Sequence, residues 1–381
     1  MGGSLHGMAT TSPVPAPQTT DAMPIHGIDH LELFVGNAAQ AAFFFQHAYG
    51  FTETAYRGLE TGSRGSVSHV LEQGRIRLVV TGTLTGDDRI AEHHKRHGDG
   101  VQAIALSVPD AAAAYEHAVA NGARGIETPY EITDEHGAVR LASVETYGET
   151  RHVFVERDGY LGAFLPGYER RGTAPTGPDG LFAGIDHVVG NVPLGHMEEW
   201  VHYYERVFGM TEMIHFSDEA ISTEYSALMS KVVTDGSGRV KFPINEPAQG
   251  KKKSQIEEYL DFYRGPGVQH IALTTTDIVR TVGELRSRGV EFLPIPPSYY
   301  AEVPDRVGPI DESMTDLREL GILVDRDDEG YLLQIFTKPI GDRPTVFFEV
   351  IERHGSRGFG EGNFKALFEA LEREQQRRGN L

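Results

Sequence analysis

The chain has 381 residues, more than one typical hydrophobic core holds, so we expect two domains. Its net charge of −20 excludes a nucleic-acid surface, because such a surface would repel phosphates. Cysteine is absent, which excludes disulfides, thiolate nucleophiles and iron–sulfur clusters. Any metal must therefore be held by imidazole and carboxylate groups. No segment has the length of apolar sequence that a membrane span needs, and no secretion signal is apparent, so we expect a cytoplasmic protein.

The first half begins after a polar, Pro-rich segment, 1–23, that we expect to be disordered. In the domain predicted over 24–170, "GIDHLELF" (27–34) reads as a strand and is followed by an amphipathic helix that ends at Gly50. "HHKRH" (93–97) spaces two histidines as a helix could use them for metal, but no third ligand is near, so we predict a solvated helix. "GVQAIAL" (100–106) is a further strand, and Asp110 opens the helix after it.

The second half repeats these elements in the same order after a linker at 171–183. Three segments correspond to segments of the first half: "GIDHVVGN" (184–191) to "GIDHLELF", "GVQHIAL" (267–273) to "GVQAIAL", and "TVFFE" (345–349) to "HVFVE" (152–156). Asp277 again opens a helix after the second strand, and "DGSGR" (235–239) reads as a hairpin turn. Three ordered matches indicate a duplication, with a second domain over 184–381.

The order of elements favours an α+β fold with two tandem domains. Each domain is expected to be an open mixed β-barrel made of two βαβββ modules, with alternate side chains pointing into a cavity. The last segment, 361–378, has apolar residues at helical spacing and predicts a C-terminal helix that closes the cavity as a lid. These residues are Phe364, Leu367, Phe368 and Leu371.

Only the second copy carries a complete set of metal ligands. Its matched positions hold His187, His270 and Glu349, whereas the first copy has His30, Ala103 and Glu156. Two imidazoles and one carboxylate form the facial triad of non-haem Fe(II) oxygenases. Strand alternation places Ile185, His187 and Val189 on one face. We therefore predict an iron site in the second domain and a scaffold role for the first.

Long motifs in the second half resemble one known family. These are "PINEP" (243–247), "KKKSQIEEYL" (251–260), "GVQHIAL", "LLQIFTKP" (332–339), "RPTVFFEVIER" (343–353) and "GFGEGNF" (358–364). Together with the duplication, they are similar to the 4-hydroxyphenylpyruvate dioxygenase family of the vicinal oxygen chelate superfamily. The resemblance covers about residues 24–378.

The resemblance implies a site and a reaction. His187, His270 and Glu349 match the family's iron ligands, and the other matching positions are the polar residues Ser230, Asn245, Gln255, Gln269 and Gln334, the aromatic residues Phe336, Phe347, Phe359 and Phe364, and Asn363 in the C-terminal gate. A regular strand would, however, turn Gln269 away from His270. The implied reaction converts 4-hydroxyphenylpyruvate and O2 to homogentisate and CO2 in tyrosine catabolism, with Fe(II) as cofactor and a homodimer or homotetramer as the assembly.

Three alternatives stay open at this point. 4-Hydroxymandelate synthase shares the substrate and metal, but "PINEP" and the phenylalanine-rich lining favour the dioxygenase. An extradiol ring-cleaving dioxygenase would use the same triad without the C-terminal gate motif. A non-catalytic binding protein of this fold would be expected to have an incomplete triad.

Overall fold

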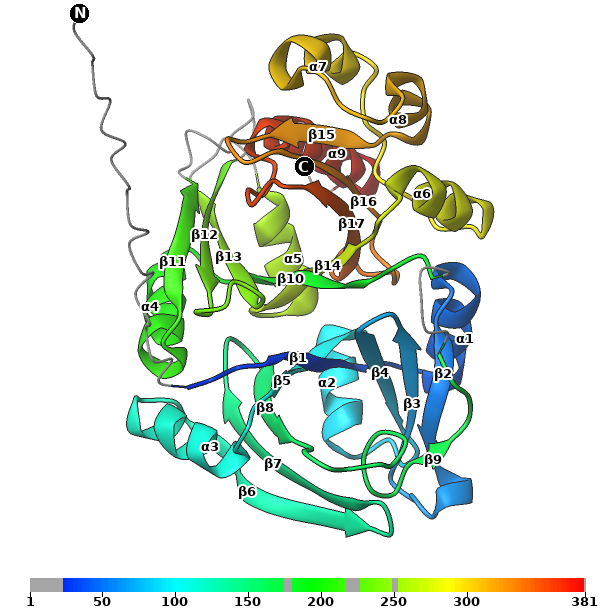
Figure 1. Cartoon of the computed structure of the whole chain (residues 1–381), viewed down its shortest axis with the longest axis vertical. Coiled ribbons are helices and arrows are strands. Elements are labelled where there is room, and N and C mark those ends of the chain that lie inside the picture. Colours follow the sequence, from blue (N-terminus) through cyan, green and yellow to red (C-terminus); the bar gives the residue numbers. More distant parts are fainter. Residues whose placement is uncertain (1–22, 175–179, 217–226, 249–252, 380–381) are drawn as a thin grey trace, which may run out of the picture.

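The computed structural model describes residues 23–174, 180–216, 227–248 and 253–379, and its strands form two large mixed sheets (Figure 1). The first sheet has the strand order β6-β7-β8-β5-β1-β4-β3-β2-β9. Its strands are β1 (Gly27–Phe34), β2 (Thr52–Arg57), β3 (Ser66–Gln73), β4 (Ile76–Thr83), β5 (Gly100–Ser107), β6 (Gly125–Asp134), β7 (Gly137–Glu145), β8 (Arg151–Glu156) and β9 (Glu169–Arg170).

The second sheet has the order β11-β12-β13-β10-β14-β17-β16-β15. Its strands are β10 (Gly184–Asn191), β11 (Thr211–Phe216), β12 (Ala227–Thr234), β13 (Lys241–Ala248), β14 (Gly267–Thr274), β15 (Leu323–Arg326), β16 (Tyr331–Phe336) and β17 (Phe347–His354). The helices are α1 (Ala38–Tyr49), α2 (Arg89–His97), α3 (Ala111–Ala120), α4 (Met197–Phe208), α5 (Gln255–Tyr263), α6 (Ile278–Ser287), α7 (Tyr299–Val307), α8 (Met314–Leu320) and α9 (Phe364–Arg378), and two short 3-10 turns lie at Leu59–Thr61 and Glu361–Asn363.

Each sheet contains two modules of four strands, as predicted from the sequence, and β9 adds a ninth strand at the edge of the first sheet. The first strand of a module pairs in parallel with its own last strand, which gives the pairs β1–β4, β5–β8, β10–β13 and β14–β17. The two modules of a sheet join through antiparallel pairing of their first strands, β1 with β5 and β10 with β14. This arrangement brings β10, β14 and β17 side by side in the middle of the second sheet.

Helix starts and turns follow the local sequence. Asp110 and Asp277 cap α3 and α6 by accepting hydrogen bonds from the backbone N–H groups of Ala113 and Arg280. The turn predicted at 235–239 connects β12 to β13. None of the helices in the described part of the chain is long and apolar enough to cross a membrane.

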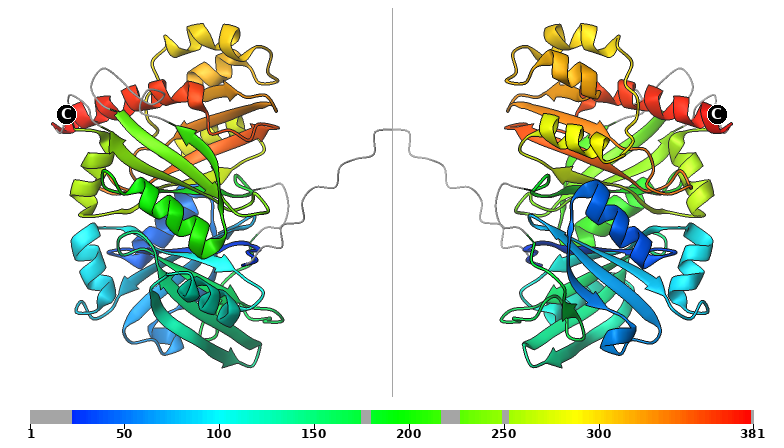
Figure 2. Two further views of the ribbon diagram at one scale, coloured as in Figure 1. Left: turned by 90° about the vertical axis from the view of Figure 1, so that its left-hand side faces the viewer. Right: turned by 90° about the vertical axis from the view of Figure 1, so that its right-hand side faces the viewer.

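The main hydrophobic core lies between the two sheets, which are stacked along the long axis of the molecule (Figure 2). Phe45 and Tyr49 of α1 pack against Phe348 of β17, with ring centroids 5.8 and 5.2 Å apart. In the reciprocal contact, Tyr204 of α4 packs against His152 of β8. Each half therefore contributes a helix that covers the sheet of the other half.

The burial of three residues differs from the sequence-based prediction. His93 and His97 lie on a helix, as predicted, but each is only 2% exposed because α2 packs against the second half through Tyr263. The predicted solvated helix is therefore wrong for these two side chains. Met23, which we assigned to the disordered segment, is buried in the core, whereas residues 1–22 lie outside the described part of the chain.

The register of the sheets corrects one correspondence between the halves. Ala103 on β5 lies opposite Arg151 on β8, and His270 on β14 lies opposite Phe347 on β17. Two residues further along, the position of Glu349 in the second half is therefore occupied by Val153 in the first. The matching of Glu156 with Glu349 is wrong by three residues.

Glu156 corresponds instead to Glu352. Both carboxylates accept a hydrogen bond from the first N–H group of the helix that follows β5 or β14, namely that of Ala111 or of Ile278. These two glutamates therefore stabilise helix starts. At the three positions equivalent to the metal ligands, the first half lacks a ligand residue at two rather than at one.

Candidate active site

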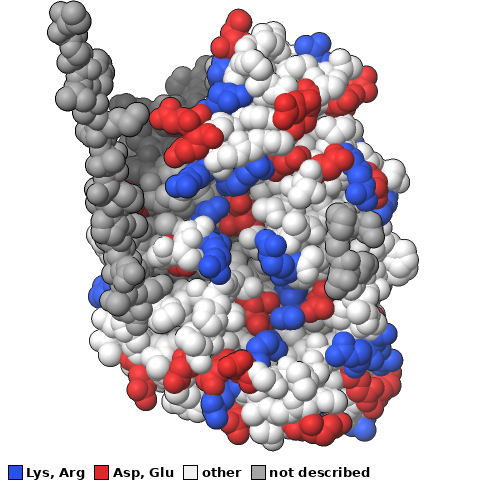
Figure 3. Space-filling model, viewed as in Figure 1, with Lys and Arg blue, Asp and Glu red and all other residues white. Residues whose placement is uncertain are grey.

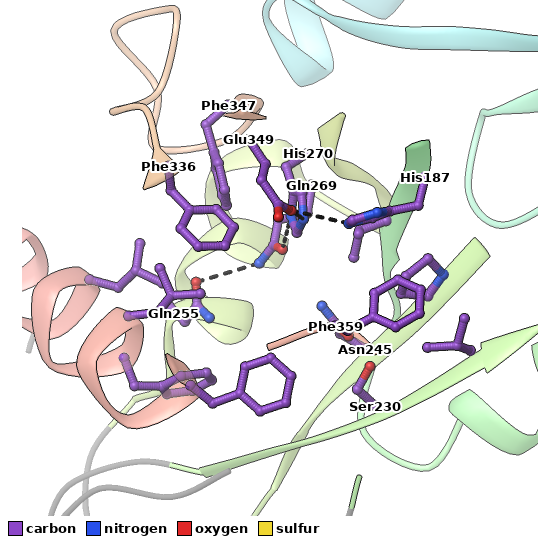
Figure 4. A pocket seen from close by; sticks show the side chains of 17 residues that line it. His187, Ser230, Asn245, Gln255, Gln269, His270, Phe336, Phe347, Glu349 and Phe359 are labelled. Atoms are coloured by element: carbon purple, nitrogen blue, oxygen red, sulfur yellow. Dashed lines mark hydrogen bonds and ion pairs between the residues drawn. The ribbon is translucent and has the colours of Figure 1, made fainter. Parts of the chain in front are cut away.

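Three adjacent strands bring His187, His270 and Glu349 together inside the second sheet. The side chains come from β10, β14 and β17, and each residue is at most 8% exposed. Nε2 of His187 and Nε2 of His270 lie 3.1 and 3.4 Å from Oε2 of Glu349 (Figure 4). One ligand atom from each residue lies within 4.8 Å of the other two.

The residue before each histidine fixes the orientation of its ring. Nδ1 of His187 donates to Oδ1 of Asp186 at 2.8 Å, and Nδ1 of His270 donates to Oε1 of Gln269 at 2.8 Å. With Nδ1 engaged in this way, the Nε2 lone pair of each ring faces the other ligands. The sequence-based expectation that Gln269 turns away from His270 is wrong, because its amide curls back to the ring.

Burial and neighbouring charges shift the pKa values of the three groups. Burial would raise the pKa of Glu349, but His187 and His270 outweigh it and lower that pKa to about 2, so the group is a carboxylate. Burial lowers the pKa of His270 below its usual value, an effect that Glu349 offsets only in part. Burial also acts to lower the pKa of His187, but the carboxylates of Glu349 and Asp186 reverse the shift and raise it.

A cavity opens in front of the triad and is walled by strands, by α5 and by α9. Eleven of the sequence-predicted site residues line it: His187, Ser230, Asn245, Gln255, Gln269, His270, Phe336, Phe347, Glu349, Phe359 and Phe364. Leu367, Phe368 and Leu371 of α9 complete the wall, as expected of a lid helix. Val189, Val232 and Pro243 also line the cavity, and of these the sequence pattern had pointed only to Val189.

Two predicted residues lie outside this lining. Gln334 is buried behind Gly360, and a Cβ atom added at Gly360 would lie 2.4 Å from Nε2 of Gln334. The amide of Gln334 has no hydrogen-bond partner among the described residues. Asn363 is also buried, and its Oδ1 accepts hydrogen bonds from Tyr299 and Arg306 at the start of α9. The structure therefore places Asn363 in the attachment of the lid helix.

One strand residue is also placed differently from its prediction. A bulge in the pairing of β10 with β14 lies between Ile185 and His187 and interrupts the alternation of side chains. Ile185 consequently packs against the main core, whereas His187 and Val189 face the cavity. The prediction that Ile185 shares their face is wrong.

Behind His187 lies a group of charged residues that the sequence analysis did not single out. Asp186 is 7% exposed and accepts hydrogen bonds from Arg353 at 2.8 and 2.9 Å and from Lys241 at 3.2 Å. Burial would raise the pKa of Asp186, but the hydrogen bonds from His187 and Arg353 hold it well below its usual range. The "GIDH" motif was the available signal, because an Asp before a ligand His can orient the ring.

The donor set fits a divalent transition metal such as iron. Two imidazole nitrogens and one carboxylate oxygen converge, and the remaining nitrogen of each ring is occupied by an acceptor. The described residues of the first half offer no such set, because Ala103 and Val153 stand at two of the equivalent positions. Among the described residues, this arrangement supports a mononuclear site in the second half.

Comparison with known proteins identifies the family. The glyoxalase/bleomycin resistance protein/dioxygenase superfamily matches residues 27–164 and 184–335. The 4-hydroxyphenylpyruvate dioxygenase of Dictyostelium discoideum is 49% identical over 368 residues, which cover 94% of this chain and 100% of that protein. The chain belongs to the 4-hydroxyphenylpyruvate dioxygenase family.

Other relatives of this family agree over most of their length. The 4-hydroxyphenylpyruvate dioxygenase of Aspergillus fumigatus is 45% identical over 98% of both chains. A solved variant of 4-hydroxymandelate synthase from Streptomyces coelicolor superimposes with a TM-score of 0.84 at 35% identity and covers 93% of this chain and 100% of its own. The fold predicted from the sequence is confirmed.

Proposed function

We propose that the protein is an Fe(II)-dependent 4-hydroxyphenylpyruvate dioxygenase that forms homogentisate and CO2 from its substrate and O2. The observation that carries this proposal is a complete two-histidine, one-carboxylate set at the base of a cavity lined by phenylalanines and amides. Similarity along nearly the whole chain to proteins of this activity supports it. All atoms balance, because both oxygen atoms enter the two products.

The metal would be held by His187, His270 and Glu349. When bound, Fe(II) supplies the activation of dioxygen and the oxidative decarboxylation of a chelating α-keto acid. The protein's own contribution is to hold the three ligands on rigid strands and to keep each Nε2 free through hydrogen bonds to Asp186 and Gln269.

The cavity walls suit an aromatic keto acid. Phe336 and Phe347 lie beside His270, with ring centroids 5.8 and 4.9 Å away, and offer an apolar surface to a substrate ring. Ser230 and Asn245 face each other across β12 and β13 and offer a hydroxyl and an amide. We assign these four residues to substrate binding.

The amides of Gln255 and Gln269 provide further polar groups at the cavity wall. They are within hydrogen-bond distance of each other at 3.4 Å, and Gln269 also accepts from His270. We assign both to orienting the substrate and the second ligand. The lid residues of α9 exclude water, so that a reactive intermediate meets the substrate ring rather than solvent.

4-Hydroxymandelate synthase is the second candidate, because a solved variant of it shares this fold at 35% identity. The dioxygenase is favoured by identities of 45–49% to its relatives. The domain limits of 24–170 and 184–381, a homodimeric or homotetrameric assembly and a cytoplasmic location stay predictions.

Identification of the product tests the proposal. We expect the purified protein, supplied with Fe(II), ascorbate and 4-hydroxyphenylpyruvate in air, to give homogentisate with one CO2 released per O2 consumed. Chromatography that shows mainly 4-hydroxymandelate would assign the chain to the synthase. Absence of any aromatic product from metal-loaded protein would refute both candidates.

A further inference from the structure

A unit of five side chains occurs twice in the molecule, once in each half. In the second half, Arg353 binds both carboxylate oxygens of Asp186, which orients His187. In the first half, Arg157 binds both oxygens of Asp29 at 2.7 and 2.6 Å, and Asp29 accepts from Nδ1 of its own neighbour, His30, at 2.7 Å. The same histidine–carboxylate–guanidinium chain is therefore kept in both sheets.

Each guanidinium also holds the segment that follows its strand. Nη1 of Arg353 donates to the carbonyl groups of Ser356 at 3.2 Å and Gly358 at 2.7 Å. These carbonyls lie three residues and one residue before Phe359, whose ring packs against His187 with centroids 4.9 Å apart. One side chain thus contacts both the orienting partner of a metal ligand and the backbone that places a cavity wall.

The first half repeats this second contact as well. Nη1 of Arg157 donates to the carbonyl group of Phe164, and the Phe164 ring packs against His30 with centroids 5.0 Å apart. The guanidinium carbons of Arg157 and Arg353 lie 5.3 and 5.6 Å from the centroids of their respective phenylalanine rings.

A second cation completes each unit. Lys241 reaches Asp186 at 3.2 Å and lies 5.9 Å from the centroid of Phe359. Arg77 reaches Asp29 at 3.4 Å and lies 5.5 Å from the centroid of Phe164.

The two units differ in what they cover. Phe164 packs against Ala55, Val70 and Val79 in a closed apolar cluster. Phe359, by contrast, lines the cavity that contains the ligand triad. The unit in the first half therefore has only a structural role in the core. A role at the cavity and the ligand triad can belong only to the unit of Arg353.

We propose that Arg353 is a positioning residue that couples the orientation of the metal ligand His187 to the placement of the cavity wall Phe359. A guanidinium is suited to this task, because its planar fork presents five donors and can satisfy a carboxylate and backbone carbonyls at once. Lysine keeps the charge but provides a single ammonium, which cannot reproduce both sets of contacts. The inference about substrate rests on the proposed function, whereas the inference about metal does not.

Arg353→Lys and the matched Arg157→Lys variant test this coupling. In Arg353→Lys we expect the affinity for Co(II), titrated anaerobically by its visible absorption, to fall by about tenfold or more. Binding of 4-hydroxyphenylpyruvate to the anaerobic Fe(II) protein should weaken severalfold as well. Arg157→Lys should lower the thermal midpoint to a similar extent but leave both binding constants at wild-type values.

Two results would overturn the proposal. One is an Arg353→Lys protein with unchanged affinity for both Co(II) and the keto acid, and the other is equal weakening of both affinities in Arg157→Lys.

If Arg353→Lys does not fold, Asp186→Asn serves instead, since it keeps the contacts of Arg353 to Ser356 and Gly358. We then expect weaker Co(II) binding with a smaller effect on the keto acid, and unchanged Co(II) binding would refute the coupling. A wild-type protein that binds Co(II) without turning over 4-hydroxyphenylpyruvate would contradict the proposed function. The Co(II) affinities of the variants would then still test the role of Arg353.

Discussion

His93 is a buried imidazole whose ring nitrogens have no hydrogen-bond partner among the described residues. It packs between Phe34 of β1 and Tyr263 of α5, at the contact between the halves. Burial, with smaller contributions from neighbouring cations, lowers its pKa from 6.5 to about 3, so the folded protein holds it neutral. Below pH 6.5 the unfolded chain gains a proton here that the folded chain does not, so stability falls as the pH drops from 6.5 toward 3.

Replacing this imidazole should flatten the pH dependence of stability. When the pH is lowered from 7 to 5, we expect the free energy of unfolding of His93→Phe to fall by about 2 kcal/mol less than that of the wild type. Some loss should persist, because burial also lowers the pKa of His152 to about 4. Urea unfolding at the two pH values measures the difference. Equal losses in the variant and the wild type would show that His93 is not held neutral.

At the same scale, the sequence predicted which residues gather at the site but not how each side chain is used. His187 and His270 were found because the duplication allows two copies of each strand to be compared, whereas Glu349 was matched to Glu156 in a register that the sheets do not have. Gln269 was expected to point away, since strand alternation does not describe a side chain that curls back to its neighbour. Asn363 matches a family position, yet its contacts with Tyr299 depend on a helix far away in sequence.

At the scale of elements, α9 forms one wall of the cavity. Phe368 is 2% exposed and contributes to the cavity wall together with Leu367 and Leu371. Arg378 near the end of α9 forms hydrogen bonds with Glu258 of α5, which fixes the helix across the opening. The apolar spacing in the sequence predicted this helix and its inward face correctly.

Shortening one lid side chain should separate decarboxylation from ring hydroxylation. In Phe368→Ala we expect CO2 release to exceed homogentisate formation, with 4-hydroxyphenylacetate accumulating, because water reaches the reacting centre. Phe154→Ala, in the core of the first half, is the control: it should cost a similar ~3–5 kcal/mol of stability without uncoupling. Tight coupling in Phe368→Ala, measured as CO2 per homogentisate, would show that α9 is only part of the core.

Element boundaries were predicted well where local chemistry decides them. Asp110 and Asp277 mark helix starts because their side chains satisfy free N–H groups. The match of Glu156 with Glu349 failed because two short apolar strands can be aligned in several registers. Only the pairing of β8 with β5 and of β17 with β14 decides between those registers.

At the scale of the whole molecule, the two halves are copies of one duplicated unit with a shared core, and only the second half carries the buried triad of His187, His270 and Glu349. Figure 3 shows acidic and basic side chains interspersed over the face in view, rather than gathered into a field of one sign. The sequence could predict the duplication, because its motifs recur in order. It could not predict the reciprocal packing of α1 on β17 and α4 on β8, because each contact joins residues of different repeats.

The first half keeps His30 with its orienting Asp29 but has Ala103 and Val153 at the other ligand positions. Our central claim is therefore that one metal ion binds per chain, in the second half. Anaerobic titration with Fe(II), with metal bound per chain as the readout, tests this claim most directly. We predict one equivalent for the wild type and for His30→Ala, and none for a folded His270→Ala protein. Loss of iron from folded His30→Ala, or its full retention in His270→Ala, would contradict the claim.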